Sequence, residues 1–164
     1  MKKIIQASFM KKFALDLGIF LVSSIIVTII STNLPERYYN YKNWIYKERK
    51  WENKGEFYQQ VFKVKRWKNH MPEIADFIKS AFSKNSIKEF DNEYIEKYLL
   101  ESSRAEFAHW CIIFSSVIFL FYEGIATFIY MLLIAILLDA PFIIIQRYNR
   151  PRIIRIMKRK GFEI

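Results

Sequence analysis

Cysteine and histidine are scarce in this sequence. The single cysteine, Cys111, excludes an internal disulfide and a zinc site built from several cysteines. The two histidines stand among scattered acidic residues and do not form a recognisable metal-ligand set, so we predict no metal site and no bound cofactor. Internal repeats and low-complexity tracts are missing as well. A chain of 164 residues is expected to form one domain, 1–164.

Apolar and basic residues are in excess. Hydrophobic residues make up 52% of the chain, and 26 Lys+Arg against 16 Asp+Glu give a net charge of +10. Three apolar runs predict membrane helices at 10–33, 104–122 and 125–147, because a helix needs about 20 largely apolar residues to cross the hydrocarbon core. The second run is long enough only if Glu106 and His109 are included at its start. We therefore predict an all-α integral membrane protein with one N-terminal helix and a C-terminal hairpin.

The first apolar run lacks the features of a cleaved signal peptide, although it follows a basic start. No small-x-small cleavage site follows it. Its apolar stretch is also longer than the roughly 7–15 residues of a signal peptide. We expect an uncleaved membrane helix.

The long polar segment, 34–103, mixes aromatic and basic side chains, which favours the lipid headgroup layer. Nucleic-acid-binding proteins use the same residue types, but beside three membrane segments we expect no nucleic acid. Ser86 and Glu89 have the spacing of a capping box. One apolar helical stripe is predicted to lie on the membrane or over the helix ends, and it consists of Ile74, Phe77, Ile78, Ala81 and Phe82. The segment is predicted to form an interfacial helical cap.

Lysine and arginine are distributed unevenly among the loops. Residues 1–12 carry 4 of them, residues 34–104 carry 15, and residues 147–164 carry 7. With three spans, the long segment and the basic tail, 148–164, share one side, which then holds 22 basic residues against 4. The positive-inside rule places that side in the cytoplasm of a multi-pass cell-membrane protein.

Ionisable residues stand at the mouth of the predicted hairpin. Glu106 and His109 are one helical turn apart, so the carboxylate is expected to hold the imidazole and raise its basicity. If the turn centres near Glu123, Asp139 lies opposite Phe107, within one turn of both. Ionisable residues inside a membrane are costly and usually mark a functional site or a paired network.

Structural interpretations stand beside these functional ones. Glu106 and His109 could sit in the headgroup zone while Asp139 fastens the hairpin. Cys111 could be a nucleophile, although a lone thiol in an apolar run is more typical of packing. Pro141 is expected to break the third helix, because it frees a backbone carbonyl one turn back.

The third run ends in a basic stretch, Gln146 to Arg152, with the sequence QRYNRPR. Guanidinium groups bind phosphates and carboxylates through two parallel hydrogen bonds. The alternative is a basic anchor that binds anionic lipid. At the start of the second run, Arg104 is expected to form a local ion pair with Glu101.

Three stretches together resemble the glycosyl-4,4'-diaponeurosporenoate acyltransferases: RWKNHMP at 66–72, ESSRAEFAHW at 101–110 and QRYNRPR at 146–152. The N-terminal hydrophobic segment, the length and the basic tail fit as well. These enzymes are small membrane proteins of Gram-positive bacteria that esterify a fatty acyl group onto the sugar of a glycosylated C30 carotenoid acid, the last step toward staphyloxanthin-type pigments. The resemblance implies the same reaction, on that acceptor or a similar glycolipid, with an acyl-thioester donor such as acyl-CoA.

Such a reaction needs a base and polar groups around its substrates. We predict His109 as the base, oriented by Glu106 with Asp139 nearby, and His70 as a second candidate. The candidates that stabilise the negative charge developing on the carbonyl oxygen are Arg104, Arg147 and Asn149. The candidates that bind the phosphates of the acyl donor are Arg66, Arg150 and Arg152, with Trp67 beside them. The rival interpretation is a non-enzymatic membrane scaffold that binds anionic lipid.

Overall fold

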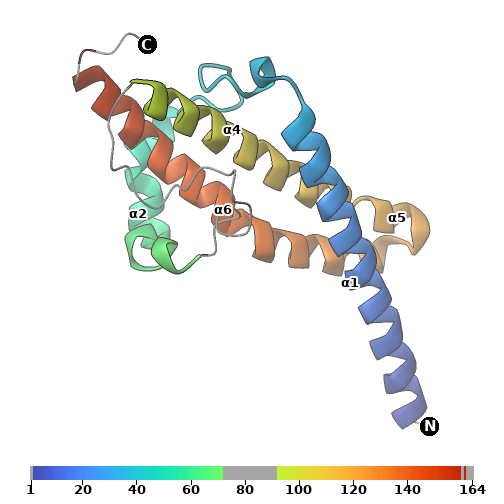
Figure 1. Ribbon diagram of the computed structural model, residues 1–164. Helices are drawn as coiled ribbons and strands as arrows, with labels where there is room; N and C mark the ends of the chain where they lie inside the picture. Colours follow the sequence, from blue (N-terminus) through green and yellow to red (C-terminus); the bar gives the residue numbers. More distant parts are fainter. Residues whose placement is uncertain (1, 72–91, 160, 162–164) are drawn as a thin grey trace. The chain divides into compact units, whose positions relative to one another are not determined.

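The computed structural model of the protein describes residues 2–71, 92–159 and 161. Every regular element in these residues is a helix, which confirms the all-α fold class (Figure 1). With η for a 3-10 helix, the elements are α1 (Lys2–Asn33), η1 (Glu36–Tyr39), η2 (Lys50–Gly55), α2 (Glu56–Phe62), η3 (Val64–Arg66), η4 (Lys68–His70), α4 (Asn92–Ser115), α5 (Ile118–Tyr122) and α6 (Ile125–Arg159).

Three of the described helical stretches are long and apolar enough to cross a membrane: Phe9–Asn33, Ile95–Tyr122 and Ile125–Arg159. They confirm the three predicted membrane helices, and the protein is a membrane protein. Large apolar side chains such as Ile25 and Leu137 are exposed on these helices. A helix that is apolar on its outer face as well is typical of a lipid surrounding.

The chain divides into two compact units, and α4 and α6 each contribute to both. The first unit consists of Met1–Leu34 and Phe107–Pro141, and we call it the hairpin unit. The second consists of Pro35–Glu106 and Phe142–Ile164, and we call it the arginine unit after the side chains described below.

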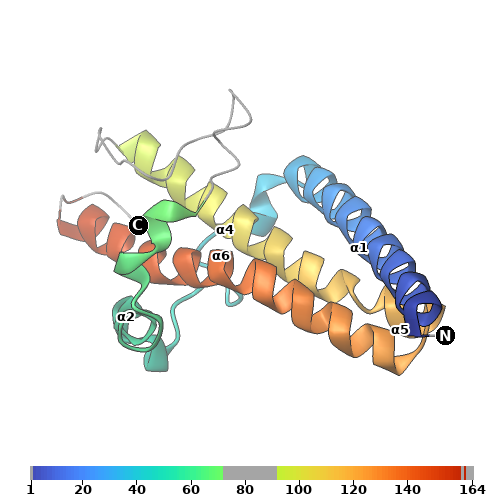
Figure 2. The same ribbon diagram turned by 90° about the horizontal axis from the view of Figure 1, so that it is seen from below.

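Polar contacts join α1 to the hairpin in the hairpin unit. The Lys12 ammonium lies 2.6 Å from the Glu123 carboxylate at the hairpin turn, and Ser23 Oγ lies 3.4 Å from Ser115 Oγ. The N-terminal part of α1 therefore lies beside the turn, as a three-span chain requires. Figure 2 shows α5 at the end of the hairpin. The predicted single helix 104–122 is interrupted between α4 and α5, where the Ser116 hydroxyl donates to the carbonyl of residue 113.

Helix α6 corrects two predictions. It runs unbroken through Pro141 and Pro151, so the expected break at Pro141 is wrong. Each proline removes one backbone donor, and the helix continues on both sides of it. The helix also continues to Arg159 instead of ending at 147, because part of the predicted tail is apolar and buried. That part packs against α4 in a core made of Ile95, Tyr98, Leu99, Ile153 and Met157.

Residues 36–70 of the long polar segment form short helices in the arginine unit. Three successive residues before α2 have left-handed backbones, namely Asn53, Lys54 and Gly55. Gly55 is required here, because a Cβ at this position would lie 2.8 Å from the Tyr148 carbonyl oxygen of α6. Both views show α2 beside α6, where Tyr58 and Val64 pack on Tyr148. The predicted stripe at 74–82 and the capping box at 86–89 lie outside the described residues.

Candidate active site and buried arginine network

A histidine and a carboxylate meet inside the hairpin unit. His109 on α4 and Asp139 on α6 approach with Nδ1 2.7 Å from Oδ1. Only 12% of the His109 side chain and 9% of the Asp139 side chain are exposed. The predicted meeting of these residues across the hairpin is therefore confirmed. It follows from two antiparallel helical segments joined by a short turn, in which residues equally distant from the turn face each other.

The contact between His109 and Asp139 favours one tautomer of the histidine when the carboxylate is ionised. Such a carboxylate can only accept hydrogen bonds, and Nδ1 of His109 is then the donor. The lone pair of a neutral imidazole then lies on Nε2, the opposite ring atom. A histidine held in this way can accept a proton from a substrate hydroxyl while the carboxylate stabilises the imidazolium that forms.

A second polar cluster in the hairpin unit fastens α1. Asp16 is fully buried and accepts a hydrogen bond from the Tyr130 hydroxyl, while Thr127 donates to Glu123 at 3.1 Å. The hydrogen bond from Lys12 lowers the pKa of the Glu123 carboxyl. Sequence reasoning missed this cluster. The one available signal was the spacing of Lys12 and Asp16, one helical turn apart at the start of an apolar run.

The Glu106 carboxylate is the centre of the arginine unit. It is fully buried, and Arg147 Nε donates to Oε1 at 2.5 Å. Nη1 of Arg150 lies 2.7 Å from Oε2 without the alignment of a hydrogen bond, so this contact is a charge interaction. The expectation that Glu106 orients His109 is thus corrected, because its carboxylate holds two guanidinium groups. A buried carboxylate gains more from cations than from a neutral ring.

The same two arginines hold the segment 45–47 of the chain. Arg147 donates to the carbonyls of Ile45 and Lys47, and Arg150 donates to the carbonyl of Tyr46 at 3.0 Å. Arg150 also donates to the Ser102 carbonyl, and only 2% of Arg150 is exposed. These guanidinium groups were predicted to bind substrate. The contacts place them inside the fold, where they position backbone.

Glu52 is a second buried carboxylate in this network. It accepts hydrogen bonds from the Tyr58 hydroxyl and from the Arg49 backbone, each at 2.5 Å, and Arg147 Nη1 lies 3.4 Å away. Burial and the hydrogen bond to Glu52 raise the pKa of the Tyr58 hydroxyl, so it remains a donor. The negative charges of Glu52 and Glu106 therefore balance the positive charges of Arg147 and Arg150.

The RWKNHMP and QRYNRPR stretches also meet in the arginine unit. Lys68 Nζ donates to Asn149 Oδ1 at 3.2 Å, although the two residues are 81 positions apart in the chain. Arg152 donates to Glu56 at 2.6 Å. Neither Lys68 nor Glu56 was among the predicted site residues, and a lysine inside a basic run offered no signal that distinguished it.

The remaining predicted residues are also in the arginine unit. Arg104 forms the predicted ion pair with Glu101, and its guanidinium lies 5.2 Å from the centroid of the Tyr39 ring. The Trp67 indole donates to the carbonyl of residue 62, whereas the side chains of Arg66 and His70 are exposed. His70 therefore lies in a different unit from the His109–Asp139 pair.

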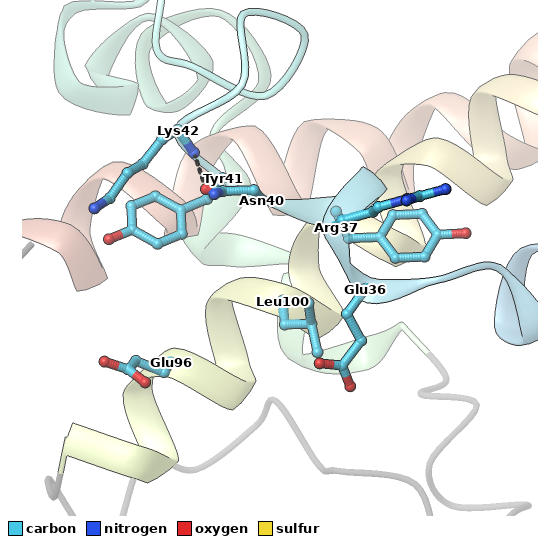
Figure 3. Close-up of a pocket in the computed structure, with 8 residues that line it drawn as sticks. Glu36, Arg37, Asn40, Tyr41, Lys42, Glu96 and Leu100 are labelled. Atoms are coloured by element: carbon cyan, nitrogen blue, oxygen red, sulfur yellow. Dashed lines mark hydrogen bonds between the residues drawn. The ribbon is translucent and has the colours of Figure 1, made fainter.

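A cavity of about 390 Å³ opens in the arginine unit (Figure 3). It is lined by Glu36, Arg37, Tyr39, Asn40, Tyr41, Lys42, Glu96 and Leu100. Figure 3 shows side chains of both charges around it. Burial, followed by the Glu96 charge, raises the pKa of the Tyr41 hydroxyl. None of the predicted site residues lines this cavity.

Comparisons with known proteins identify the family. The sequence model of the glycosyl-4,4'-diaponeurosporenoate acyltransferases matches residues 42–159. Two curated relatives with that name, from Staphylococcus aureus strains Newman and bovine RF122 / ET3-1, are 30% and 29% identical over 164 residues. Each alignment covers 98% of this chain and 96% of the relative. No solved structure matches the chain. The predicted enzyme class is confirmed, and the scaffold interpretation is not supported: this chain is an acyltransferase that belongs to the glycosyl-4,4'-diaponeurosporenoate acyltransferase family.

Proposed function

We propose that the protein transfers a fatty acyl group from an acyl thioester to a sugar hydroxyl of a glycosylated carotenoid acid, such as glycosyl-4,4'-diaponeurosporenoate, or of a similar membrane glycolipid. Two findings support the proposal. The chain belongs to a family named for this acceptor. The hairpin unit also holds a histidine–carboxylate pair within a membrane-spanning segment, and that pair is the observation that carries the mechanism.

In this mechanism His109 is the general base. Its Nε2 accepts the proton of the sugar hydroxyl while the hydroxyl oxygen attacks the thioester carbonyl. The tetrahedral intermediate then collapses, the C–S bond breaks, and the imidazolium returns the proton to the departing thiolate. The products are an ester and a free thiol. A positioned base of this type contributes about 10²- to 10⁴-fold to the rate.

Asp139 is a positioning residue in this proposal. Its carboxylate fixes the Nδ1–H tautomer of His109 and stabilises the imidazolium during proton transfer. Both side chains are largely shielded from solvent, which strengthens their interaction. Since the pair lies among apolar membrane helices, the acceptor is a lipid that enters from the bilayer.

We propose that the arginine unit faces the cytoplasm. The loops and tail on that side carry 22 of the 26 basic residues, in agreement with the positive-inside rule. The contact between Lys12 and Glu123 supports a three-span topology, because it puts the start of α1 and the hairpin turn on one side. A cytoplasmic face would give access to a cytosolic acyl thioester.

The test uses lipid extracts from a host that makes the glycosylated carotenoid acid, with and without the protein. Mass spectrometry is expected to show a mass gain of one fatty acyl chain. His109→Ala should lower the rate about 10²- to 10⁴-fold at equal membrane abundance. Phe114→Leu, an exposed change on the same helix, is the control and should keep full turnover.

Asp139→Asn separates positioning from structure. It should lower kcat while KM for the acceptor stays the same, and Asp139→Glu should recover part of the loss. Full turnover in His109→Ala would contradict the assignment of the base, and His70→Ala would then show whether the exposed histidine takes that role. Absence of any acylated product with folded protein in the membrane would overturn the proposed acceptor.

A further inference from the structure

Two cationic side chains share one aromatic ring on the arginine unit. The Arg152 guanidinium carbon lies 3.7 Å from the centroid of the Tyr148 ring, and Lys68 Nζ lies 5.4 Å from the same centroid. These side chains come from η4 and α6, two segments that are distant in the sequence. The ring therefore brings two positive charges together.

The charges around this ring are less balanced than those around Glu106. Arg152 contacts Glu56, whose side chain is 44% exposed, so solvent weakens that ion pair. Lys68 has a neutral hydrogen-bond partner, Asn149. By contrast, Arg147 and Arg150 contact the fully buried acids described above. Burial, followed by the nearby charges of Arg152 and Lys65, lowers the pKa of the Lys68 ammonium. An anion placed here would relieve the repulsion between the two cations.

Asn149 and Arg152 each keep donor groups beyond the hydrogen bonds described above. Asn149 accepts from Lys68 through Oδ1, so its amide NH₂ takes no part in that bond. Arg152 uses Nη1 on the Tyr148 carbonyl at 2.9 Å and Nη2 on Glu56, and three of its five N–H groups are not needed for those two bonds. The backbone at Gly55 lies close to this arginine, because a Cβ at Gly55 would lie 2.9 Å from Arg152 Nη1. The Arg152 side chain is 22% exposed, which leaves it accessible.

We infer that Lys68, Asn149 and Arg152 form a binding site for a phosphate ester. Guanidinium and ammonium groups together with an amide are the donors that phosphate oxygens accept. Two ligands carry this chemistry: the phosphates of coenzyme A in an acyl-thioester donor, and the headgroup phosphate of an anionic phospholipid. The first source rests on the proposed acyl transfer, whereas the second does not.

The experiment uses the full-length protein in nanodiscs and measures binding without turnover. In phosphatidylcholine discs, coenzyme A is titrated and its affinity measured by calorimetry. In a second arm, without coenzyme A, a fluorescent phosphatidylglycerol is titrated into the same discs. Lys68→Gln should lower the affinity for one of these two ligands about tenfold or more, because a hydrogen bond to a charged group is lost. Arg152→Gln should act on the same ligand, and Lys50→Gln, an exposed lysine of the same unit, should leave both affinities unchanged.

The dependence on pH gives a readout that a purely structural role would not change. Binding requires the ammonium form of Lys68, so affinity is full below the pKa of Lys68 and falls as the pH rises through it. Because that pKa is lowered, the fall should begin at a lower pH than for an ordinary lysine, and it should vanish in Lys68→Gln.

Each outcome of these binding measurements either supports or overturns the phosphate site. Weaker coenzyme A binding in Lys68→Gln supports the site with the acyl donor as ligand, and weaker phosphatidylglycerol binding supports it with a lipid headgroup. Unchanged affinity for both ligands in Lys68→Gln, with the melting temperature of the unchanged protein, overturns the site. A protein that binds coenzyme A but forms no ester would keep the phosphate site and refute the acyl transfer.

Discussion

The buried carboxylates of the two units contact different kinds of partner. In the hairpin unit, Asp139 faces an imidazole and Asp16 faces a tyrosine hydroxyl. In the arginine unit, Glu106 and Glu52 face guanidinium groups. All four acids are buried, so burial alone does not separate them. The difference lies in the partner.

The partner determines what a buried acid can do. A guanidinium is always charged, so Glu106 and the arginines form a permanent ion network with no proton to exchange. An imidazole nitrogen can accept a proton and give it up again, so the pair of His109 and Asp139 is suited to proton transfer. The first arrangement holds parts of the fold together, and the second is the catalytic pair that we propose.

The largest effect on stability is expected from Glu106→Ala. Removal of this carboxylate leaves the buried Arg150 without its counter-charge, and breaking a buried pair in this way typically destabilises a protein by about 3–5 kcal/mol. Thermal unfolding in detergent, followed by tryptophan fluorescence, would measure the loss. Glu36→Ala removes an exposed acid from the same unit and should leave the melting temperature almost unchanged. Equal melting temperatures for the two variants would contradict the assigned role of the network.

A smaller effect is expected from Gly55→Ala. The residue has a φ of +83°, and the added Cβ would lie 2.8 Å from the Tyr148 carbonyl oxygen. Backbone strain of this kind is worth about 1–3 kcal/mol, and the clash adds to it. Gly124→Ala in the hairpin unit is the matched control, because Gly124 has a φ of +94° but no neighbouring atom within 4 Å of the added Cβ. Calorimetric unfolding of both variants isolates the close approach, and equal losses would mean that the contact with α6 is unimportant.

The smallest effect is expected from Ser115→Ala in the hairpin unit. Its hydroxyl lies 3.4 Å from Ser23 Oγ, and hydrogen bonds between membrane helices contribute about 0.6 kcal/mol on average. The Ser115 hydroxyl also donates to its own helix at 2.7 Å, which weakens its role between helices. Hydrogen exchange of α1 in nanodiscs should change little. A large increase in exchange along α1 would show that this contact, rather than apolar packing, holds the helix.

Much of the fold could be predicted because it depends on local composition. Apolar runs of sufficient length predict membrane helices wherever they occur, and the turn at Glu123 sets which residues of the hairpin face each other. The meeting of His109 with Asp139 follows from that register. The continuation of α6 beyond residue 147 could not be predicted in this way, since Tyr148, Ile153 and Met157 are held helical by contacts with distant parts of the chain.

The partners of the charged residues were harder to predict. Glu106 and His109 are one helical turn apart, so their spacing in the sequence predicts that they contact each other. The structure assigns Glu106 to Arg147 and Arg150, which lie 41 and 44 positions further along the chain. Many arginines are available in this basic sequence, and spacing alone does not tell which of them is buried. The short helices between residues 35 and 71 raise the same difficulty, because left-handed residues such as Lys63 carry no strong sequence signal.

The sequence by itself determined the class of molecule: an all-helical membrane protein with three apolar helices, an excess of basic residues next to them, and a histidine opposite an acid in the hairpin. Hydrophobic length and helical periodicity are local properties, so they can be read along the chain. Only the tertiary structure decided that Arg147 and Arg150 hold buried acids and backbone while Lys68 and Arg152 gather on Tyr148. The physical reason is that the role of an arginine or lysine depends on its burial and on the counter-charge it meets, and both are set by residues far away in the sequence.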